Sequence, residues 1–392
     1  MNSIALYTQR LAQLVAKPSV SSVSPTWDMG NRDVIDLLAG WLYDLGFAVD
    51  IQGIPGKPNK ANLIATRGSG PGGLVLSGHT DTVPYDENRW QQDPFSLKEQ
   101  GGKLFGLGAT DMKGFFPTVL AACDEFANTP FEQPLIVLAT ADEESSMSGA
   151  RLLADTGLPK ARYAVIGEPT GLKPIYMHKG IMMEAIRIQG LAGHSSNPSL
   201  GLNALEAMQM VMTELLAFRR DMQEKYRNPG FEVDVPTLNL GHIHGGDNPN
   251  RICGHCELHF DLRPLPGMDI DSLRAEVTRR ILPIEQTTGT SISVEPLFES
   301  VPPFQESHDS PLLQSLEKLS GYAAESVAFA TEAPFLKSLG MQTMVFGPGS
   351  IDQAHQPNEF IDLQQIEPAI FMLKQLVQQF CVQKQPLIHS LR

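Results

Sequence analysis

Two polar side chains that could hold a metal ion follow an apolar run typical of a buried strand. His79 and Asp81 come shortly after the run at 73–77, and residues two apart on an extended segment share a face. Asp81 could therefore orient the His79 imidazole, as carboxylates do behind metal-bound histidines. A hydrogen-bonded turn is the alternative interpretation. Asp111 lies in a glycine-rich segment that leads into a predicted helix, so it could be a ligand or an N-cap.

Further acidic and imidazole side chains follow other apolar runs. The carboxylates at 142–144 follow the run at 135–141, and three consecutive carboxylates repel one another unless a cation or solvent relieves them. Glu168 follows another apolar run, and His355 lies in a loop rich in Gly and Pro beyond 343–346. A solvated acidic loop and a surface turn are the simpler interpretations of the two acidic segments.

Five separate segments thus each bring a His, Asp or Glu to what would be one rim of a sheet. Open α/β sheets keep their functional sites past the carboxyl ends of their strands. Nitrogen and oxygen ligands without thiolate suit a pair of zinc or similar divalent ions. The coincidence of the five segments therefore predicts a two-metal centre.

The elements that must position these residues alternate between β-rich and helical runs, which is typical of an α/β domain. Continuous apolar strands separated by helices indicate a largely parallel sheet that is buried on both faces. In the first part of the chain we expect strands at 73–77, 135–141 and 163–167, a helix after Lys113 and a helix from Ser148. After a Pro-rich link at 301–303 we expect a helix at 311–319, a strand at 343–346 and a helix at 363–380.

Between these two parts the order of elements changes to βαββαβ, which is the order of a ferredoxin-like unit. We expect a strand at 182–189, a helix at 203–218, strands at 237–243 and 252–262, a helix at 270–282 that Pro283 stops, and a strand at 291–296. The architecture that follows is a discontinuous α/β domain, residues 1–181 and 300–392, with a smaller domain, residues 182–299, inserted into it.

Composition and charge exclude several other classes of protein. The 392 residues are 42% hydrophobic and 19% charged, which favours a globular chain over a disordered one. The net charge of −14 disfavours binding to nucleic acid, and no run approaches the ~20 apolar residues of a membrane span. Four scattered cysteines are too few for a disulfide framework, so a reducing, cytoplasmic setting is expected. Cys253 and Cys256 have the spacing of a zinc knuckle or redox pair, but no second pair follows them.

Taken together, these motifs resemble the aminoacylase, carboxypeptidase and desuccinylase family of two-zinc amidohydrolases. The resemblance runs along nearly the whole chain. The segments that carry it are LFGLGATDMKG (104–114), TADEESSMSGAR (140–151), IGEPTGLKP (166–174), GLAGHSSNPSLGLNA (190–204), NRICGHCELHFDLRPLPGM (250–268) and FGPGSIDQAHQPNEF (346–360).

The resemblance implies how the metal ligands are shared between two ions. One ion would be held by His79, Asp111 and Glu168. The other would be held by Asp111, Glu144 and His355, so that Asp111 bridges the two. Zn²⁺ is the ion expected, with Co²⁺ as an alternative.

The resemblance also implies roles for three residues that do not bind metal. Glu143 would be the general base, Asp81 would stand behind His79, and His194 of the smaller domain would donate to the oxyanion. In dimeric relatives this histidine comes from the partner subunit, so we expect a homodimer formed through the inserted domain, which also closes as a lid. A cis peptide bond after Asp111 is expected as well.

The activity implied is hydrolysis of an N-acyl amino acid, with removal of acetate from N2-acetyl-L-ornithine as the reaction expected. Arg251 is a candidate to bind the substrate α-carboxylate through two hydrogen bonds of its guanidinium group, with Asn250 as a neighbouring donor. The alternative interpretation is that Arg251 is an exposed arginine at a strand edge. Glu332 is a candidate partner for a cationic side chain. The alternatives are a desuccinylase acting on succinyl-diaminopimelate, another N-acyl amino acid deacylase, and a catalytically silent metal-binding scaffold.

Overall fold

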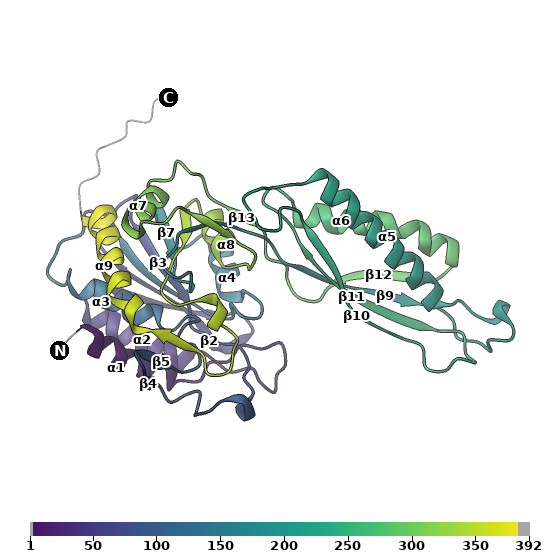
Figure 1. The fold of residues 1–392 in the computed structure, drawn as a ribbon, viewed down its shortest axis with the longest axis horizontal. Coiled ribbons are helices and arrows are strands. Elements are labelled where there is room, and N and C mark those ends of the chain that lie inside the picture. The colour runs from purple at the N-terminus through teal and green to yellow at the C-terminus, as the bar shows by residue number, and fades with distance from the viewer. Residues whose placement is uncertain (1–2, 383–392) are drawn as a thin grey trace. The chain divides into compact units, whose positions relative to one another are not determined.

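The computed structural model describes residues 3–382, and the chain divides into two compact units. The first unit comprises the chain up to Tyr176, Glu306–Glu325, and the chain from Thr331 onward. The second comprises Met177–Gln305 and Ser326–Ala330. Each unit has its own sheet and its own helices (Figure 1). The predicted α/β class is confirmed.

The first unit is built on a mixed sheet whose strands follow the order β1-β2-β6-β3-β7-β15-β8-β13. The four strands β6, β3, β7 and β15 are parallel to one another, as predicted, whereas β1, β2 and β8 pair in antiparallel fashion. The bounds are β1 (Ala48–Ile54), β2 (Lys57–Arg67), β3 (Leu74–His79), β6 (Leu135–Thr140), β7 (Tyr163–Ile166), β8 (Ile175–His178) and β15 (Gln342–Val345). The short strand β13 (Phe304–Gln305) ends this order, and β14 (Glu325–Val327) pairs with β8. The short strands β4 (Lys98–Gln100), β5 (Lys103–Phe105) and β16 (Phe360–Asp362) form a separate sheet.

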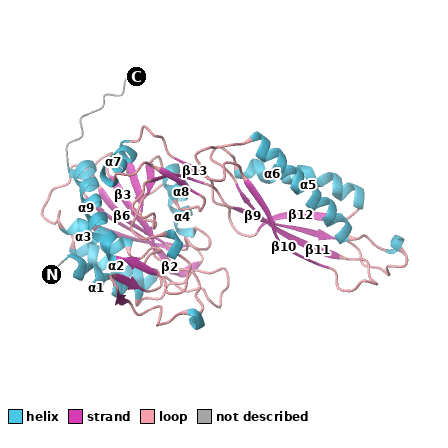
Figure 2. Ribbon diagram, in the orientation of Figure 1, coloured by secondary structure: helices cyan, strands magenta, loops and turns pink. Residues whose placement is uncertain are grey.

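Helices cover the sheet because every residue of β3, β6 and β7 is buried. A strand that is apolar on both sides needs a helix layer on each face of its sheet. Helices α1, α3 and α9 pack against one another, and α4 packs against α8; Figure 2 shows strands between these two groups. The bounds are α1 (Ser3–Val15), α2 (Arg32–Asp44), α3 (Phe115–Asp124), α4 (Ser148–Thr156), α7 (Pro311–Ser320), α8 (Ala333–Ser338) and α9 (Ile366–Val377).

The second unit has the predicted βαββαβ order. Its four strands form an antiparallel sheet of order β10-β11-β9-β12, and its two helices lie along one face of that sheet (Figure 2). The bounds are β9 (Met182–Gln189), α5 (Ala204–Lys225), β10 (Thr237–Gly245), β11 (His255–Arg263), α6 (Ile270–Thr288) and β12 (Ser291–Pro296).

The predicted end of one helix is wrong. Pro283 does not stop α6, which continues to Thr288. Ile281 and Ile284 are buried on either side of the proline, so packing outweighs the ~3 kcal/mol that a proline costs inside a helix. The helix ends instead at Gly289, whose φ of 69° suits a C-terminal glycine.

No helix between residues 3 and 382 combines the length and the apolar composition needed to cross a membrane.

Candidate metal centre

Four of the five candidate ligands lie at or beyond the carboxyl ends of the four parallel strands, and the fifth is Asp111. His79 is the last residue of β3, and the carboxylates at 142–144 follow β6. Glu168 follows β7, and His355 follows β15. Because these strands are adjacent and parallel, their carboxyl ends meet at one edge of the sheet. The convergence predicted from the sequence is therefore a property of the fold.

Asp111 lies at the middle of this group. Its Oδ1 is 3.0 Å from Nε2 of His79, and its Oδ2 is 3.5 Å from Nε2 of His355. His355 Nε2 is also 3.0 Å from Oε2 of Glu144, and His79 Nε2 is 3.9 Å from Oε2 of Glu168. One ligand atom each from His79, Asp111 and Glu144 lies within 4.8 Å of the others. The five predicted ligands are therefore brought together.

Asp81 contacts His79 differently from the sequence-based expectation. The His79 Nδ1 is 3.0 Å from the main-chain oxygen of Asp81, whereas the Asp81 carboxylate is 3.8 Å away. That carboxylate instead accepts hydrogen bonds from the backbone N–H groups of Glu143 (3.2 Å) and Glu144 (3.0 Å). Asp81 therefore orients the imidazole through its carbonyl and holds the acidic segment through its side chain.

The electrostatics of the centre indicate an excess of buried negative charge. Burial raises the pKa of Glu143 and of Glu168 well above the ordinary value, and neighbouring carboxylates add to the effect. Hydrogen bonds from the His355 imidazole to the carboxylates of Asp111 and Glu144 raise the pKa of His355 to about 10. Carboxylates that crowd together in a buried place favour a cation among them. The donor set of two imidazoles and several carboxylates fits divalent ions such as Zn²⁺.

The segment that carries Asp111 is held by Glu359, a residue that the sequence reasoning missed. The Glu359 carboxylate accepts hydrogen bonds from the backbone N–H groups of Gly108 (2.9 Å), Thr110 (2.7 Å) and Asp111 (3.0 Å). Helix α3 begins after Gly114, so Asp111 is not its N-cap. The peptide bond between Asp111 and Met112 is cis, as expected. Nothing in the sequence near Glu359 marks it, except that it is the second-to-last residue of the motif that contains His355.

Glu332 is buried in the first unit, at the start of α8, with 1% of its surface exposed. Burial raises its pKa to about 7, opposed by a hydrogen bond from Thr140. Its Oε1 has no hydrogen-bond partner among the described residues. A buried carboxyl group with an unused oxygen is chemically suited to receive a donor.

The remaining candidates lie in the second unit, near one another. His194 and Arg251 form an isolated β-bridge, and the backbone N–H of Ser195 donates to the carbonyl of Asn250 at 3.0 Å. Arg251 forms a salt bridge with Asp247 at 2.6 Å, and both side chains are more than half exposed. Arg251 also lines a hollow of about 430 Å³.

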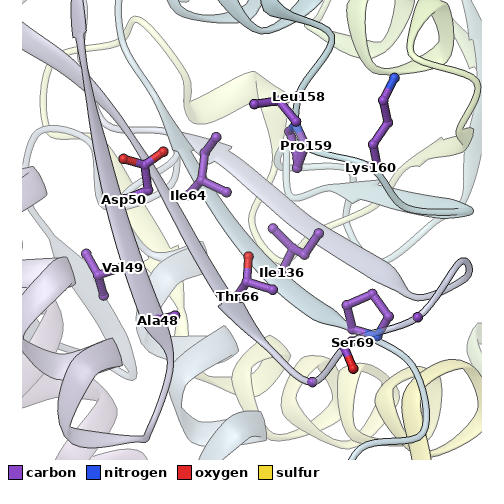
Figure 3. A pocket seen from close by; sticks show the side chains of 13 residues that line it. Ala48, Val49, Asp50, Ile64, Thr66, Ser69, Ile136, Leu158, Pro159 and Lys160 are labelled. Atoms are coloured by element: carbon purple, nitrogen blue, oxygen red, sulfur yellow. The ribbon is translucent and has the colours of Figure 1, made fainter.

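Another hollow, of about 420 Å³, lies in the first unit and is mostly apolar (Figure 3). Ile64, Ile136 and Leu158 line it, with the charged groups Asp50 and Lys160 beside them. Its described lining residues include none of the residues predicted to do chemistry. The hollow is therefore not the candidate site.

Comparison with known proteins agrees with the geometry. Residues 75–379 match the model of peptidase family M20/M25/M40. An acetylornithine deacetylase of Pectobacterium carotovorum is 48% identical over 368 residues, covering 94% of this chain and 96% of its own. An acetylornithine deacetylase of Proteus mirabilis is 48% identical over 370 residues, covering 94% of this chain and 95% of its own.

Solved structures with the same fold are more distant in sequence. A tripeptidase from Staphylococcus aureus has a TM-score of 0.75 at 17% identity, covering 96% of this chain and 98% of its own. A dinuclear metal-binding peptidase from Bacillus subtilis has a TM-score of 0.68 at 13% identity, covering 95% of this chain and 97% of its own. The fold, the converging ligands and the long family match lead to one conclusion: the chain belongs to peptidase family M20/M25/M40.

Proposed function

We propose that this chain hydrolyses the amide bond of N2-acetyl-L-ornithine and releases L-ornithine and acetate, a step of arginine biosynthesis. The observation that carries the proposal is the convergence of two histidines and the acidic ligands at one edge of the parallel sheet. Relatives named acetylornithine deacetylase, at 46–48% identity over nearly the whole chain, support the choice of substrate.

Five residues bind metal in this proposal, namely Asp111 and the four ligands that meet around it. His79, Asp111 and Glu168 would hold one divalent ion, and Asp111 with Glu144 and His355 would hold the other. Zn²⁺ fits this donor set, and Co²⁺ is an alternative. When bound, two such ions lower the pKa of water and polarise the acyl carbonyl.

Glu143 is the general base of the proposed reaction. It adjoins the ligand Glu144, and the environment that raises its pKa suits a group that must take up a proton and release it. A Glu143 carboxylate oxygen receives the proton of the attacking water and delivers it to the departing nitrogen. The hydrogen bond from the backbone N–H of Glu143 to Asp81 holds this residue in place.

Four further residues bind or orient the substrate in the proposal. His194 donates to the oxyanion that develops on the acyl group, a type of contact that is worth about 3 to 4 kcal/mol in other enzymes. Arg251 and Asn250 bind the α-carboxylate, for which Arg251 must exchange its bond to Asp247. The unused oxygen of Glu332 is the proposed acceptor for the ornithine ammonium group.

We also propose that residues 182–299 act as a lid and form a homodimer. Exposed apolar side chains in this region support the dimer; they are Leu191, Leu200, Leu202, Leu205 and Met210. Exposed apolar patches of this kind are typical of protein interfaces. Four cysteine thiols with no disulfide among them support a cytoplasmic setting.

The test is a hydrolysis panel with the metal-reconstituted enzyme. N2-acetyl-L-ornithine, N-succinyl-L,L-diaminopimelate and N-acetyl-L-methionine are compared by kcat/KM with Zn²⁺ and with Co²⁺. We expect the acetylornithine compound to give the highest value. A higher kcat/KM for the succinyl compound would assign the chain to desuccinylation, and no hydrolysis of any compound would favour a silent scaffold.

A further inference from the structure

Four side chains of metal-ligating types, none of them part of the centre already described, lie on two neighbouring strands of the second unit. Strand β10 carries His242 and His244, and strand β11 carries Glu257 and His259. Each pair is two residues apart, so its two side chains share a face of the sheet. We call these four residues the strand quartet.

The register of the two strands brings the pairs together. His242 lies opposite His259, and His244 lies opposite Glu257. Directly opposed residues on antiparallel strands have Cβ atoms about 5 Å apart. The quartet is therefore a block of two by two side chains, with three imidazoles and one carboxylate.

A bulge in β10 turns the two histidines onto this face. Leu240 lies opposite the buried Phe260, but the register shifts between Leu240 and His242. The extra residue is Gly241. In a regular strand without the bulge, His242 is two residues after Leu240 and would share its side of the sheet. A β-bulge re-aims the side chains that follow it. The two exposed histidines consequently join His259 and Glu257 on the face opposite the buried side chains of β11.

Contacts within the quartet already join three of its members. The rings of His242 and His259 have centroids 4.8 Å apart, and Nε2 of His259 is 2.5 Å from Oε1 of Glu257. His242 and His244 are exposed, so their rings can turn without displacing the core. His244 also lines the open hollow of about 430 Å³, which gives an ion a path from solvent.

Two neighbouring side chains hold the carboxylate of Glu257 in place. Nε2 of His259 is in hydrogen-bond contact with Oε1, and the Arg187 guanidinium donates to Oε2 at 3.2 Å and to Oε1 at 3.3 Å. Arg187 also pairs with Glu295, which keeps a partner for the arginine when an ion approaches Glu257.

We propose that the strand quartet is a binding site for a divalent transition-metal ion, separate from the centre around Asp111. Three imidazole nitrogens and one carboxylate oxygen are a donor set for tetrahedral Zn²⁺ and for related ions such as Cu²⁺ and Ni²⁺. An ion bound by residues of both β10 and β11 would cross-link the edge strand β10 to its neighbour β11. The proposal does not depend on the substrate of the first unit.

The test is a titration of the full chain with Zn²⁺ alone. The enzyme is first loaded with Zn²⁺ until its hydrolytic activity is maximal and is then desalted, so that further binding reports a different site. Calorimetry then compares the unaltered chain with the double variant H242A/H244A and with the control His308→Ala, which removes a histidine of the first unit. We expect one additional equivalent of Zn²⁺ in the unaltered chain and in the control, and its loss in the double variant.

A second variant keeps the proposal testable if the double variant does not fold. Glu257→Gln preserves the size of the side chain and removes its charge, and we expect it to weaken the additional Zn²⁺ site at least about tenfold. An additional equivalent that persists unchanged in both variants, or that is missing from the unaltered chain, would overturn the proposal. Neither result bears on hydrolysis, which is measured separately on the same preparations.

Discussion

The most informative perturbation outside the metal ligands is Asp142→Asn. Asp142 has a φ of 61° and is 1% exposed. Its carboxylate accepts hydrogen bonds from Lys60, from Lys57 (2.5 Å) and from the hydroxyl groups of Ser21 and Ser148 (each 2.8 Å). Asparagine tolerates a positive φ, so the substitution removes the charge of the side chain without a new demand on the backbone.

The magnitude follows from the burial of the partners. Lys60 is 6% exposed, and removing one member of a buried ion pair costs about 3 to 5 kcal/mol. Lys60 keeps a second partner in Asp28 at 2.6 Å, which reduces the loss. Lys57 is 37% exposed, so solvent screens its ion pair with Asp142, and this pair contributes at most about 1 kcal/mol to the free energy of unfolding. We therefore expect the free energy of unfolding to fall by about 2 to 4 kcal/mol.

The assay is urea unfolding at pH 7, with Asp36→Asn as the matched control. Asp36 pairs with Arg32 at 2.8 Å on an exposed helix face, and its loss should cost less than about 0.5 kcal/mol. Burial raises the pKa of Asp142, but the hydrogen bonds from Lys57 and Lys60 outweigh it, so the net pKa lies below 3.8. Its charge therefore stabilises the fold above that pH, and the difference from the variant should shrink as the pH falls below about 4. Equal stability of the two variants at pH 7 would refute the reasoning.

Three further outcomes follow from the centre, and a fourth follows from the role proposed for Arg251 in the second unit. Glu143→Gln should lower kcat at least about a hundredfold, with metal content by atomic absorption nearly unchanged. Glu359→Gln replaces a carboxylate that accepts three backbone N–H groups, so we expect weaker metal binding at Asp111 in a Zn²⁺ competition assay. Chelation should lower the melting temperature, because an ion relieves the crowded carboxylates. Arg251→Ala should raise KM about tenfold or more for an α-carboxylate substrate, with a smaller change in kcat.

Each of these outcomes has a contrary result. Full activity of Glu143→Gln would remove this residue as the base, and loss of its metal would make it a ligand. Unchanged Zn²⁺ affinity in Glu359→Gln would limit that residue to a structural role. A melting temperature that does not respond to chelation would argue against ions within the cluster. An unchanged KM in Arg251→Ala would mean that Arg251 does not bind the substrate and only forms its salt bridge with Asp247.

The position of the candidate ligands could be predicted because the pattern of apolar residues indicates that the strands are parallel. Runs such as 135–141 are apolar without alternation, which indicates parallel strands buried on both faces. Once the strands are parallel, residues that follow them must share an edge. The same argument could not predict the antiparallel strands β1 and β2. It depends on continuous apolar runs, and β2 begins with the polar residues at 57–60.

The residues that hold the ligands in place could not be predicted. Glu359 and Asp111 are 248 residues apart in the chain, and no local pattern indicates that one carboxylate caps three amides of a distant segment. Asp81 shows the same limit, since its spacing from His79 predicts a carboxylate contact whereas the carbonyl makes it. Hydrogen bonds of this kind depend on side-chain rotamers and on packing, which the order of residues does not specify.

Asp142 and Glu143 show why neighbouring carboxylates can hold opposite roles. The positive φ of Asp142 turns the chain, so that its side chain meets the lysines while Glu143 faces the other acidic groups. The pKa of Asp142 is lowered, and the pKa of Glu143 is raised by burial and by the nearby charge of Glu168. The first carboxylate thus stabilises the fold in its ionised form, whereas the second is destabilised when ionised and takes up a proton more readily. The same run of three acidic residues contains both, and only the environment of each distinguishes the structural carboxylate of Asp142 from the proposed general base Glu143.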